Sequence, residues 1–400
     1  MKIRMLPAAR RFKTTLMRTV VFQIAVAAFM FPVLTAAQVV GVVLDPKPTL
    51  ADGAVSRIEN PGPDSVVFLE FSGAKAKRLG QANVPTSFFG PPSSVAVSAD
   101  KTLALATSSR KADPNDPKKF VPDNKLSVID LKTSAPAVLQ TLELPFPPMS
   151  IALNPQATMA LAMHTDDDSV TVLSIADGKV SVVETFSTGK GSGPHAAAFS
   201  PGGKHVLLTR GSDNRVALYV VESDKLRMPP VREMGAGVRP FAVSFCGTTG
   251  LAVVSNLGAN TGDQDTLSLI DLSINPPRII DTITVGPVPE GAACAPDGRH
   301  AAVAIQNMAN RPASNPFKQP TSKVVLIRID NKKLTRVSEA PIGVWSQGVG
   351  FLDDSRTLFG QSVMDKAMHF FRIEGNTLKS AGPPMIFDEG APVAFGVAGR

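Results

Sequence analysis

Aromatic residues and cysteines are scarce in this 400-residue chain, which has one Trp, one Tyr and two Cys. So few large aromatic rings leave little to stack on an organic redox cofactor. Neither Cys-x-x-Cys nor Cys-x-x-Cys-His occurs, so cysteine spacing indicates neither a zinc site nor attached haem. A nucleophile elbow and a glycine-rich phosphate loop leading into a helix are also missing. These absences argue against several common enzyme classes.

An excess of positive charge is also missing from most of the chain, although the net charge is +7. Six of the 41 basic residues, and none of the 34 acidic ones, lie in the first 37 residues. Without that segment 35 basic residues face 34 acidic ones, a net charge of +1. A balanced chain gives no electrostatic reason to bind nucleic acid.

The first 37 residues have the pattern of a secretory signal. A basic start precedes the apolar run Thr19–Leu34, and small residues follow up to Ala37. The run is shorter than the roughly 20 residues that a spanning helix needs. We predict a signal peptide at 1–37, a single domain at 38–400 that is periplasmic or secreted, and no membrane contact after cleavage.

Two apolar motifs repeat through the remainder. Seven strand-like hexamers begin at residues 66, 126, 170, 216, 267, 324 and 368. Between them recurs an Ala-rich segment, a turn and a second apolar run, beginning at residues 92, 148, 194, 240, 289 and 346, with a truncated copy at 392. Spacings of 44 to 60 residues fit one four-stranded blade each.

The repeats predict an all-β fold, a seven-bladed β-propeller with four-stranded blades. The first hexamer has no inner strand before it and the last Ala-rich copy has no blade after it, so N- and C-terminal segments should complete one blade and close the ring. We expect Val39–Asp45 to join that blade. Small residues fit the innermost strands, because bulky side chains would overlap at the axis.

Three stretches carry a family resemblance. The pattern P-x-x-x-x-F-S-P-x-G-K-x-x-x-x-T from Pro194, with "NRVALYVVESDKL" at Asn214–Leu226 and "NKLSVIDL" at Asn124–Leu131, resembles YVTN-type and lactonase-like seven-bladed propellers. The resemblance covers residues 60–400. It implies the propeller fold, while the superfamily's members include lactone hydrolases, cycloisomerase-like proteins and exported propellers with no known reaction. Of the family's paired-histidine motif only His195 is present.

Polar residues gather where the repeat places one end of the tunnel. We predict His195 and Glu290 as acid/base candidates, because each titrates. Predicted substrate-binding residues are Arg210, Arg239, His164, Asn256, Gln347 and Trp345. Our leading hypothesis is an exported binding or interaction protein that presents variable loops to a protein partner, acting as a monomer. The alternative is a lactonase-like hydrolase or isomerase that acts on a small anionic ligand at the tunnel mouth. A redox propeller is the weakest of the three.

Metal binding and the cysteines complete the expectations. The segments "HTDDDS" (164–169) and "NTGDQD" (260–265) offer oxygens of the kind calcium accepts, but neither has the twelve-residue calcium loop. We predict Asp/Asn turns there, with no metal site and no cofactor, and calcium as the alternative. Cys246 and Cys294 are offset by one residue in adjacent repeats, which turns their side chains to opposite faces and favours two packed thiols over a disulfide.

Overall fold

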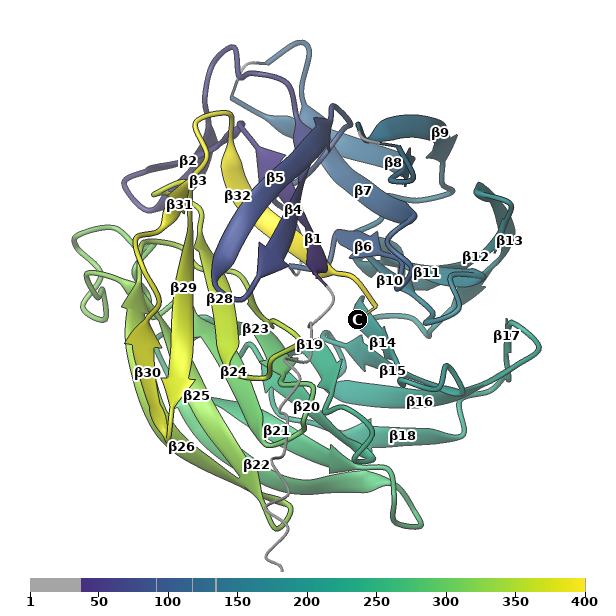
Figure 1. Cartoon of the computed structure of the whole chain (residues 1–400), viewed down its shortest axis with the longest axis vertical. Helices are drawn as coiled ribbons and strands as arrows, with labels where there is room; N and C mark the ends of the chain where they lie inside the picture. Colours follow the sequence, from purple (N-terminus) through teal and green to yellow (C-terminus); the bar gives the residue numbers. More distant parts are fainter. Residues whose placement is uncertain (1–36, 91, 117, 134, 400) are drawn as a thin grey trace, which may run out of the picture. The chain divides into compact units, whose positions relative to one another are not determined.

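Seven antiparallel sheets surround a central axis in this computed structural model, as the view down that axis shows (Figure 1). The structure describes residues 37–90, 92–116, 118–133 and 135–399. The predicted seven-bladed β-propeller is confirmed. The predicted signal peptide lies outside the described residues, apart from Ala37.

In blades 1 to 6 the strands follow chain order from the axis outward. Blade 1 is β6 (Val95–Val97), β7 (Leu103–Ala112), β8 (Phe120–Asp130) and β9 (Ala137–Glu143), and blade 2 is β10 (Ser150–Leu153), β11 (Met159–His164), β12 (Ser169–Ala176) and β13 (Lys179–Ser187). Blade 3 is β14 (Pro194–Phe199), β15 (His205–Arg210) and β16 (Arg215–Glu222), with β17 (Lys225–Leu226) and β18 (Arg232–Gly235) both paired to β16.

The next three blades repeat this order. Blade 4 is β19 (Pro240–Phe245), β20 (Leu251–Asn256), β21 (Asp265–Asp271) and β22 (Arg278–Gly286), and blade 5 is β23 (Pro289–Cys294), β24 (His300–Ile305), β25 (Ser322–Asp330) and β26 (Lys333–Ile342). Blade 6 is β27 (Val349–Phe351), β28 (Thr357–Ser362) and β29 (Ala367–Glu374), with β30 (Thr377–Ser380) and β31 (Met385–Ile386) both paired to β29.

Blade 7 joins the two ends of the described chain. Its innermost strand is β32 (Ala391–Val397), followed outward by β1 (Gln38–Asp45), β4 (Ser65–Ser72) and β5 (Lys75–Ala82). Val40 pairs with Val397 and Val42 with Phe395 across the β1–β32 ladder. Both predictions about ring closure, including the place of Val39–Asp45, are therefore confirmed.

The apolar core lies between blades. Buried side chains form a separate cluster at each interface of neighbouring blades in the described part of the chain, such as Leu126 of blade 1 with Leu173 of blade 2, or Val253 of blade 4 with Val303 of blade 5. Each apolar side chain removed from water in this way contributes about 1.5–3 kcal/mol. The blades therefore depend on one another for their stability.

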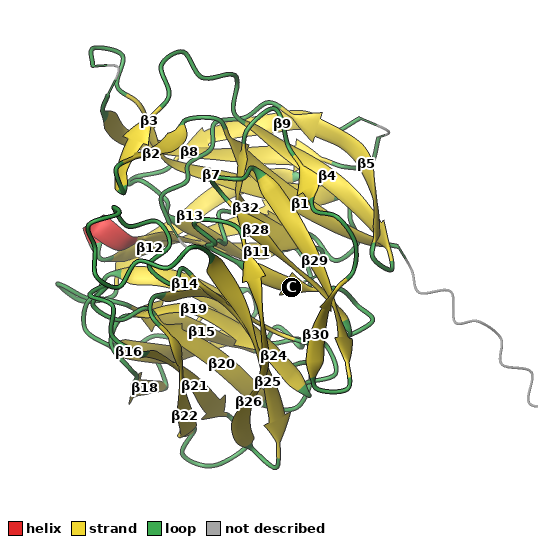
Figure 2. Cartoon of the chain, turned by 90° about the vertical axis from the view of Figure 1, so that its left-hand side faces the viewer, coloured by secondary structure: helices red, strands yellow, loops and turns green. Residues whose placement is uncertain are grey.

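The ring has two different faces. We call the face that carries the blade-to-blade connections and the loops from second to third strands the mouth face, and the opposite one, with the turns from first to second strands, the hairpin face. The short helix η1 (Thr165–Asp167) and the hairpin β2 (Pro48–Ala51)–β3 (Ala54–Arg57) follow second strands, and Figure 2 shows both on one side of the ring. None of the helices in the described residues is long and apolar enough to cross a membrane.

Loops on the mouth face touch across blades. A Cβ on Gly53, at the tip of the β2–β3 hairpin, would lie 2.2 Å from the backbone nitrogen of Pro312, in the loop of blade 5. A Cβ on Gly262 of blade 4 would lie 2.6 Å from the ring of Phe317 in that same loop. The long loops therefore support one another and form part of a rim.

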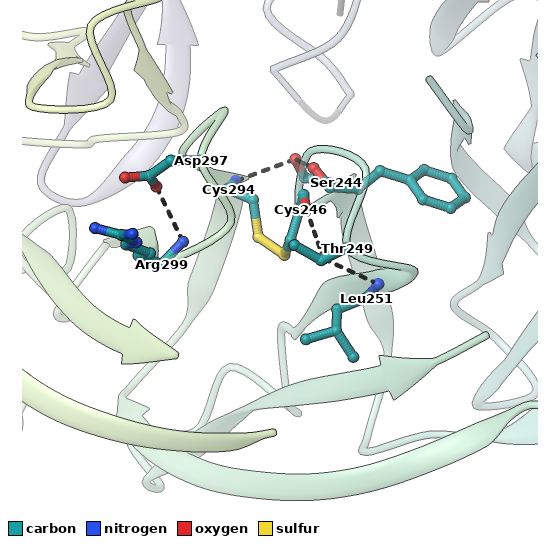
Figure 3. The surroundings of a disulfide bond; sticks show 8 residues. Ser244, Cys246, Thr249, Leu251, Cys294, Asp297 and Arg299 are labelled. Atoms are coloured by element: carbon teal, nitrogen blue, oxygen red, sulfur yellow. Dashed lines mark hydrogen bonds between the residues drawn. A yellow bond between two sulfur atoms is a disulfide. The ribbon is translucent and has the colours of Figure 1, made fainter. Parts of the chain in front are cut away.

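Cys246 and Cys294 form a disulfide, with Cα atoms 4.9 Å apart, so the expectation of two separate thiols is wrong (Figure 3). Cys294 ends β23, whereas Cys246 lies one residue beyond the end of β19. Past the strand end, the alternation of side chains that we relied on no longer sets the direction of Cys246. The backbone nitrogen of Cys294 donates to the hydroxyl of Ser244 at 3.1 Å, which holds the two innermost strands together beside the bridge.

Candidate functional site

The predicted tunnel-mouth residues occupy equivalent places in successive blades. They lie within two residues of the start of each innermost strand and form what we call the mouth ring: Ser93, Met149, His195, Phe241, Glu290 and Gln347. His195, Phe241, Glu290 and Gln347 therefore come from four consecutive blades. The structure brings the two acid/base candidates and one predicted substrate-binding residue to the same end of the tunnel.

Glu290 is buried at this end, with 3% of its surface exposed. One of its carboxyl oxygens accepts a hydrogen bond from the amide of Gln306, and the other accepts one from Gln347 at 3.2 Å. Burial raises the pKa of Glu290 from 4.5 to about 8, although the two amide donors and the charge of Arg239 oppose the rise. At neutral pH the group is mostly a neutral acid that can give up its proton near pH 8.

His195 is 5% exposed and packs with its ring centre 4.5 Å from that of Phe241. A Cβ on Gly211 would lie 2.5 Å from Cδ2 of His195, so the imidazole fits only because Gly211 has no side chain. Nδ1 is buried and has no hydrogen-bond partner among the described residues. Burial, with a smaller contribution from the charge of Arg239, lowers the pKa of His195 from 6.5 to about 3. His195 is therefore a neutral imidazole above that pH.

Arg239 stands between these two groups in the chain, on blade 4, and its charge acts on both. It is exposed, and its guanidinium has no ion-pair partner within the described part of the chain. Its φ is +55°, a left-handed conformation that costs a non-glycine residue about 1–3 kcal/mol. Val288 (φ +60°) and Trp345 (φ +64°) have the same conformation at the same position of blades 5 and 6. The repeat geometry thus places an uncompensated cation at the mouth.

Arg210, the other predicted anchor, is already paired. It ends β15, is 7% exposed, and forms ion pairs with Asp213 and, at 2.5 Å, with Glu233. Arg215 adds a second cation to the same Glu233 at 2.7 Å. Because two carboxylates compensate the charge of Arg210, Arg239 is the better placed of the two arginines to meet an anion.

His164 and Asn256, at the ends of β11 and β20, are held by hydroxyl groups. Nε2 of His164 lies 2.7 Å from the Thr171 hydroxyl, and burial lowers the pKa of His164 from 6.5 to about 4. The amide of Asn256 donates to the hydroxyls of Thr266 and Ser268, both at 2.9 Å. Both side chains are buried within their blades, so a ligand role for either stays a prediction.

Trp345 is buried in an aromatic cluster rather than open to solvent. Its ring packs edge to face on Phe88 at 5.7 Å, and Phe88 in turn contacts Phe89 and Phe120. The carbonyl of Phe88 also accepts a hydrogen bond from Gln347 at 3.3 Å. The aromatic cluster and the Glu290 site are thus linked through one amide side chain.

Hydroxyl groups from neighbouring blades fix the backbone of the mouth ring. Ser150 of blade 2 donates to the carbonyl of His195 at 2.5 Å, and Ser255 of blade 4 donates to the carbonyl of Glu290 at 2.6 Å. Each bond crosses a blade interface. The position of a site residue therefore depends on the blade before it.

The acidic loops mostly serve as caps of turns. Asp168 accepts hydrogen bonds from the backbone of Gly191 and Gly193, and Asp265 accepts one from Val288. In the described ranges no group of three or more His, Cys, Asp or Glu side chains is placed to hold a metal ion. Whether calcium binds stays untested.

Sequence reasoning missed Gln306 and the connection that carries Phe88. Gln306 follows β24 directly, one residue past the position that we considered in each repeat. The connection between β5 and β6 is longer than the other connections between blades, and its Pro92 packs near Gly291 and Gly348. Its length was the signal available in the sequence.

Comparisons with known proteins agree on the fold. No protein-family model matches the chain, and no curated protein sequence matches it. Among solved structures, a "putative 6-phosphogluconolactonase" from Bacteroides fragilis has a TM-score of 0.66 at 14% identity, covering 92% of this chain and 100% of its own. The periplasmic gluconolactonase PpgL of Pseudomonas aeruginosa has a TM-score of 0.66 at 14% identity, covering 90% and 99%. This chain shares the fold of the lactonase-like propellers.

The fold alone does not decide the chemistry. Kuenenia stuttgartiensis hydrazine synthase also matches, with a TM-score of 0.55 at 17% identity over 73% of this chain and 79% of that one. At such identities the likeness shows architecture only. The YVTN label stays a resemblance, and activity has to be argued from the mouth residues.

Proposed function

We propose that this chain is a lactonase-like hydrolase that acts on a small anionic lactone at the mouth face. The observation that carries the proposal is Glu290, a buried carboxyl whose pKa is raised to about 8 beside the unpaired Arg239. Burial of a titratable group costs stability. A buried group whose pKa lies near neutral pH is therefore typical of a general acid or base. Two structurally similar proteins are named as a putative 6-phosphogluconolactonase and a periplasmic gluconolactonase, and these names support a hydrolase over a pure interaction role.

Glu290 is the proton-transfer group, and His195 is not. A general base works best when its pKa lies near the operating pH. Glu290 meets that condition, whereas His195, with a pKa of about 3, binds a proton too weakly at pH 7. The neutral imidazole instead offers Nδ1 as a hydrogen-bonding group that orients water or substrate, since no described group satisfies it.

The reaction then proceeds as follows. Ionised Glu290 takes a proton from water while the oxygen of that water bonds to the lactone carbonyl carbon. Arg239 stabilises the negative charge that develops on the carbonyl oxygen or holds a second anionic group of the substrate. The ring C–O bond breaks, and Glu290 returns its proton to the leaving alkoxide. Lactone and water give one hydroxy acid, and the carboxylate is restored.

The test is lactone hydrolysis by the purified protein, with the anionic 6-phosphogluconolactone as first substrate and the uncharged glucono-δ-lactone as the comparison. Glu290→Gln should lower kcat at least a hundredfold, the usual range for losing a general base. The native rate should rise about tenfold per pH unit up to pH 8, after subtraction of spontaneous hydrolysis, because only ionised Glu290 acts as the base. Glu184→Gln, an exposed carboxylate on β13, is the matched control and should leave the rate unchanged. Equal rates for native protein and Glu290→Gln would contradict the proposal.

One observation supports the alternative that the chain binds a protein partner, namely the rim of loops that touch across blades. Phe317 in that rim is 52% exposed. A partner that binds there should be lost with Phe317→Ser in a pull-down, while Glu290→Gln retains it. Retention by both variants would remove the rim from consideration.

Export is the remaining part of the proposed function. The sequence of residues 1–37 favours cleavage after Ala37, and one structurally similar protein is itself named periplasmic. Expression of the full chain followed by N-terminal sequencing of the periplasmic product should give Gln38 as the first residue. A product that stays in the cytoplasm with Met1 intact would contradict export.

A further inference from the structure

The innermost strands enclose a second, chemically different space. A cavity of about 340 Å³ runs along the tunnel and is lined by residues of all seven blades. The described lining contains no charged side chain, and its polar side chains are those of Ser93, Asn154 and Ser244. Alanines, valines, prolines and phenylalanines make up most of the remainder. Size and composition are those of a site for a small apolar ligand.

The two ends of the cavity differ. At the mouth end Pro92 packs against blades 5 and 6: a Cβ on Gly348 would lie 2.5 Å from Cβ of Pro92, and one on Gly291 would lie 3.1 Å from its Cγ. At the other end the lining reaches the turns of the hairpin face, at Pro155 and Pro201. Pro92 therefore narrows the mouth end, where Gly291 follows Glu290, and we expect a ligand to enter from the hairpin face.

The walls of the cavity keep part of their apolar surface accessible although they lie at the centre of the ring. Ala197 and Ala292, on the innermost strands of blades 3 and 5, are half-buried rather than buried. So are the rings of Phe199, Phe245 and Phe395, which also line the cavity. Apolar surface left open in this way is stabilised when an apolar molecule covers it, at about 25 cal/mol per Å².

Polar side chains in the cavity are few, and most are already bonded. Asn154 bonds within its own turn, to Thr158 and Met159 at 2.9 Å, and the hydroxyl of Ser244 accepts from Cys294. The hydroxyl oxygen of Ser93 is buried and has no hydrogen-bond partner among the described residues.

We propose that the tunnel is a binding site for an uncharged, largely apolar molecule of one or two rings, which enters from the hairpin face and carries one hydrogen-bonding group that meets Ser93. Of the mouth ring only Ser93 lines this site, and the site does not depend on the proposed hydrolase activity. Absence of charge in the lining excludes the anionic ligands that Arg239 would attract. The single unsatisfied hydroxyl sets the preference for one polar group over none.

The first test is titration of the full protein with the neutral fluorescent probe N-phenyl-1-naphthylamine. Saturable binding is expected, and Ala197→Phe and Ala292→Phe, which fill the cavity from two blades, should each weaken it at least tenfold. Val182→Phe, at an exposed position on β13, adds the same ring outside the tunnel and is the matched control. Unsaturable binding, or equal affinity in the filling variants, overturns the proposal.

A second set of variants covers the case in which an added ring disturbs folding. Ala197→Ser keeps the size of the side chain but adds a hydroxyl to the wall, and should weaken the probe severalfold. Ser93→Ala should abolish the preference for 1-naphthol over naphthalene in competition with the probe. Glu290→Gln should bind the probe as the native chain does. Loss of probe binding in Glu290→Gln would place the probe at the mouth and refute the tunnel site.

Discussion

Replacing Glu290 with Gln should remove a loss of stability that the native chain undergoes as pH rises toward neutral. The pKa of Glu290 rises from 4.5 to about 8 on folding, because burial disfavours its ionised form. Between these two values the unfolded chain releases the proton while the folded chain keeps it. The unfolded state then binds fewer protons, so the free energy of unfolding falls as pH rises.

The magnitude follows from the two pKa values. Each pH unit in this window lowers the free energy of unfolding by about 1.4 kcal/mol, so the native chain loses about 3 kcal/mol between pH 4.5 and pH 7. The loss levels off above pH 8. The Gln side chain of Glu290→Gln is neutral at every pH, so the variant does not undergo this pH-dependent loss of unfolding free energy. Relative to the native chain, the variant should gain about 3 kcal/mol from pH 4.5 to pH 7, whatever its stability at the starting pH.

Urea unfolding at several pH values, followed by fluorescence of Trp345, the one tryptophan in the chain, measures this difference. Glu184→Gln is the matched control, since it removes an exposed carboxylate. If the native chain and Glu290→Gln give parallel curves of stability against pH, Glu290 is not held neutral by the fold, and the reasoning that makes it the proton-transfer group fails with it. A stabilised variant that has lost hydrolysis would instead show that the site is maintained at a cost in stability.

Three further outcomes follow from the geometry. Arg239→Gly relieves the left-handed backbone and should raise stability by up to about 1 kcal/mol while KM for an anionic lactone rises at least tenfold. Asp177→Gly, at an exposed turn residue with a φ of +53°, should give the first effect without the second. Gly211→Ala pushes its Cβ against the His195 ring and should cost about 1–3 kcal/mol in urea unfolding, whereas Gly202→Ala, with nothing within 4 Å of its Cβ, should be neutral. Reduction of the disulfide, which closes a separation of 48 residues, should lower the free energy of unfolding by up to about 4 kcal/mol; an unchanged urea midpoint would refute its bracing role.

The fold was predictable because a propeller repeats one physical problem. Every blade needs small residues near the axis and a turn at the hairpin face, so the Ala-rich copies carry the same signal repeatedly. The unpaired first hexamer and the truncated copy at Pro392 predicted the pairing of β1 with β32. Local irregularities escaped the repeat. Cys246 lies just past a strand end, where period-two alternation stops, and so the disulfide was not foreseen.

The candidate site was predictable as a set of positions but not as a set of interactions. His195 and Glu290 followed from their equivalent places in the repeats. The sequence did not predict which arginine is free of an ion pair. Arg210 is neutralised by Asp213 and by Glu233 of β18, and pairing of that kind depends on side-chain geometry. Gln306 was missed for the same reason, since its amide matters only through the carboxyl it reaches.

The closure of blade 7 has a consequence for how the ring assembles. β1 is buried along its whole length and rich in valine, yet its inner neighbour β32 is separated from it in the sequence by the other six blades. Until β32 arrives, one edge of an apolar strand stands unpaired and can join another chain. A chain that is cut before β32, or in which β32 has not yet docked, therefore presents an aggregation-prone edge, and the pairing of β1 with β32 protects the protein against association through it.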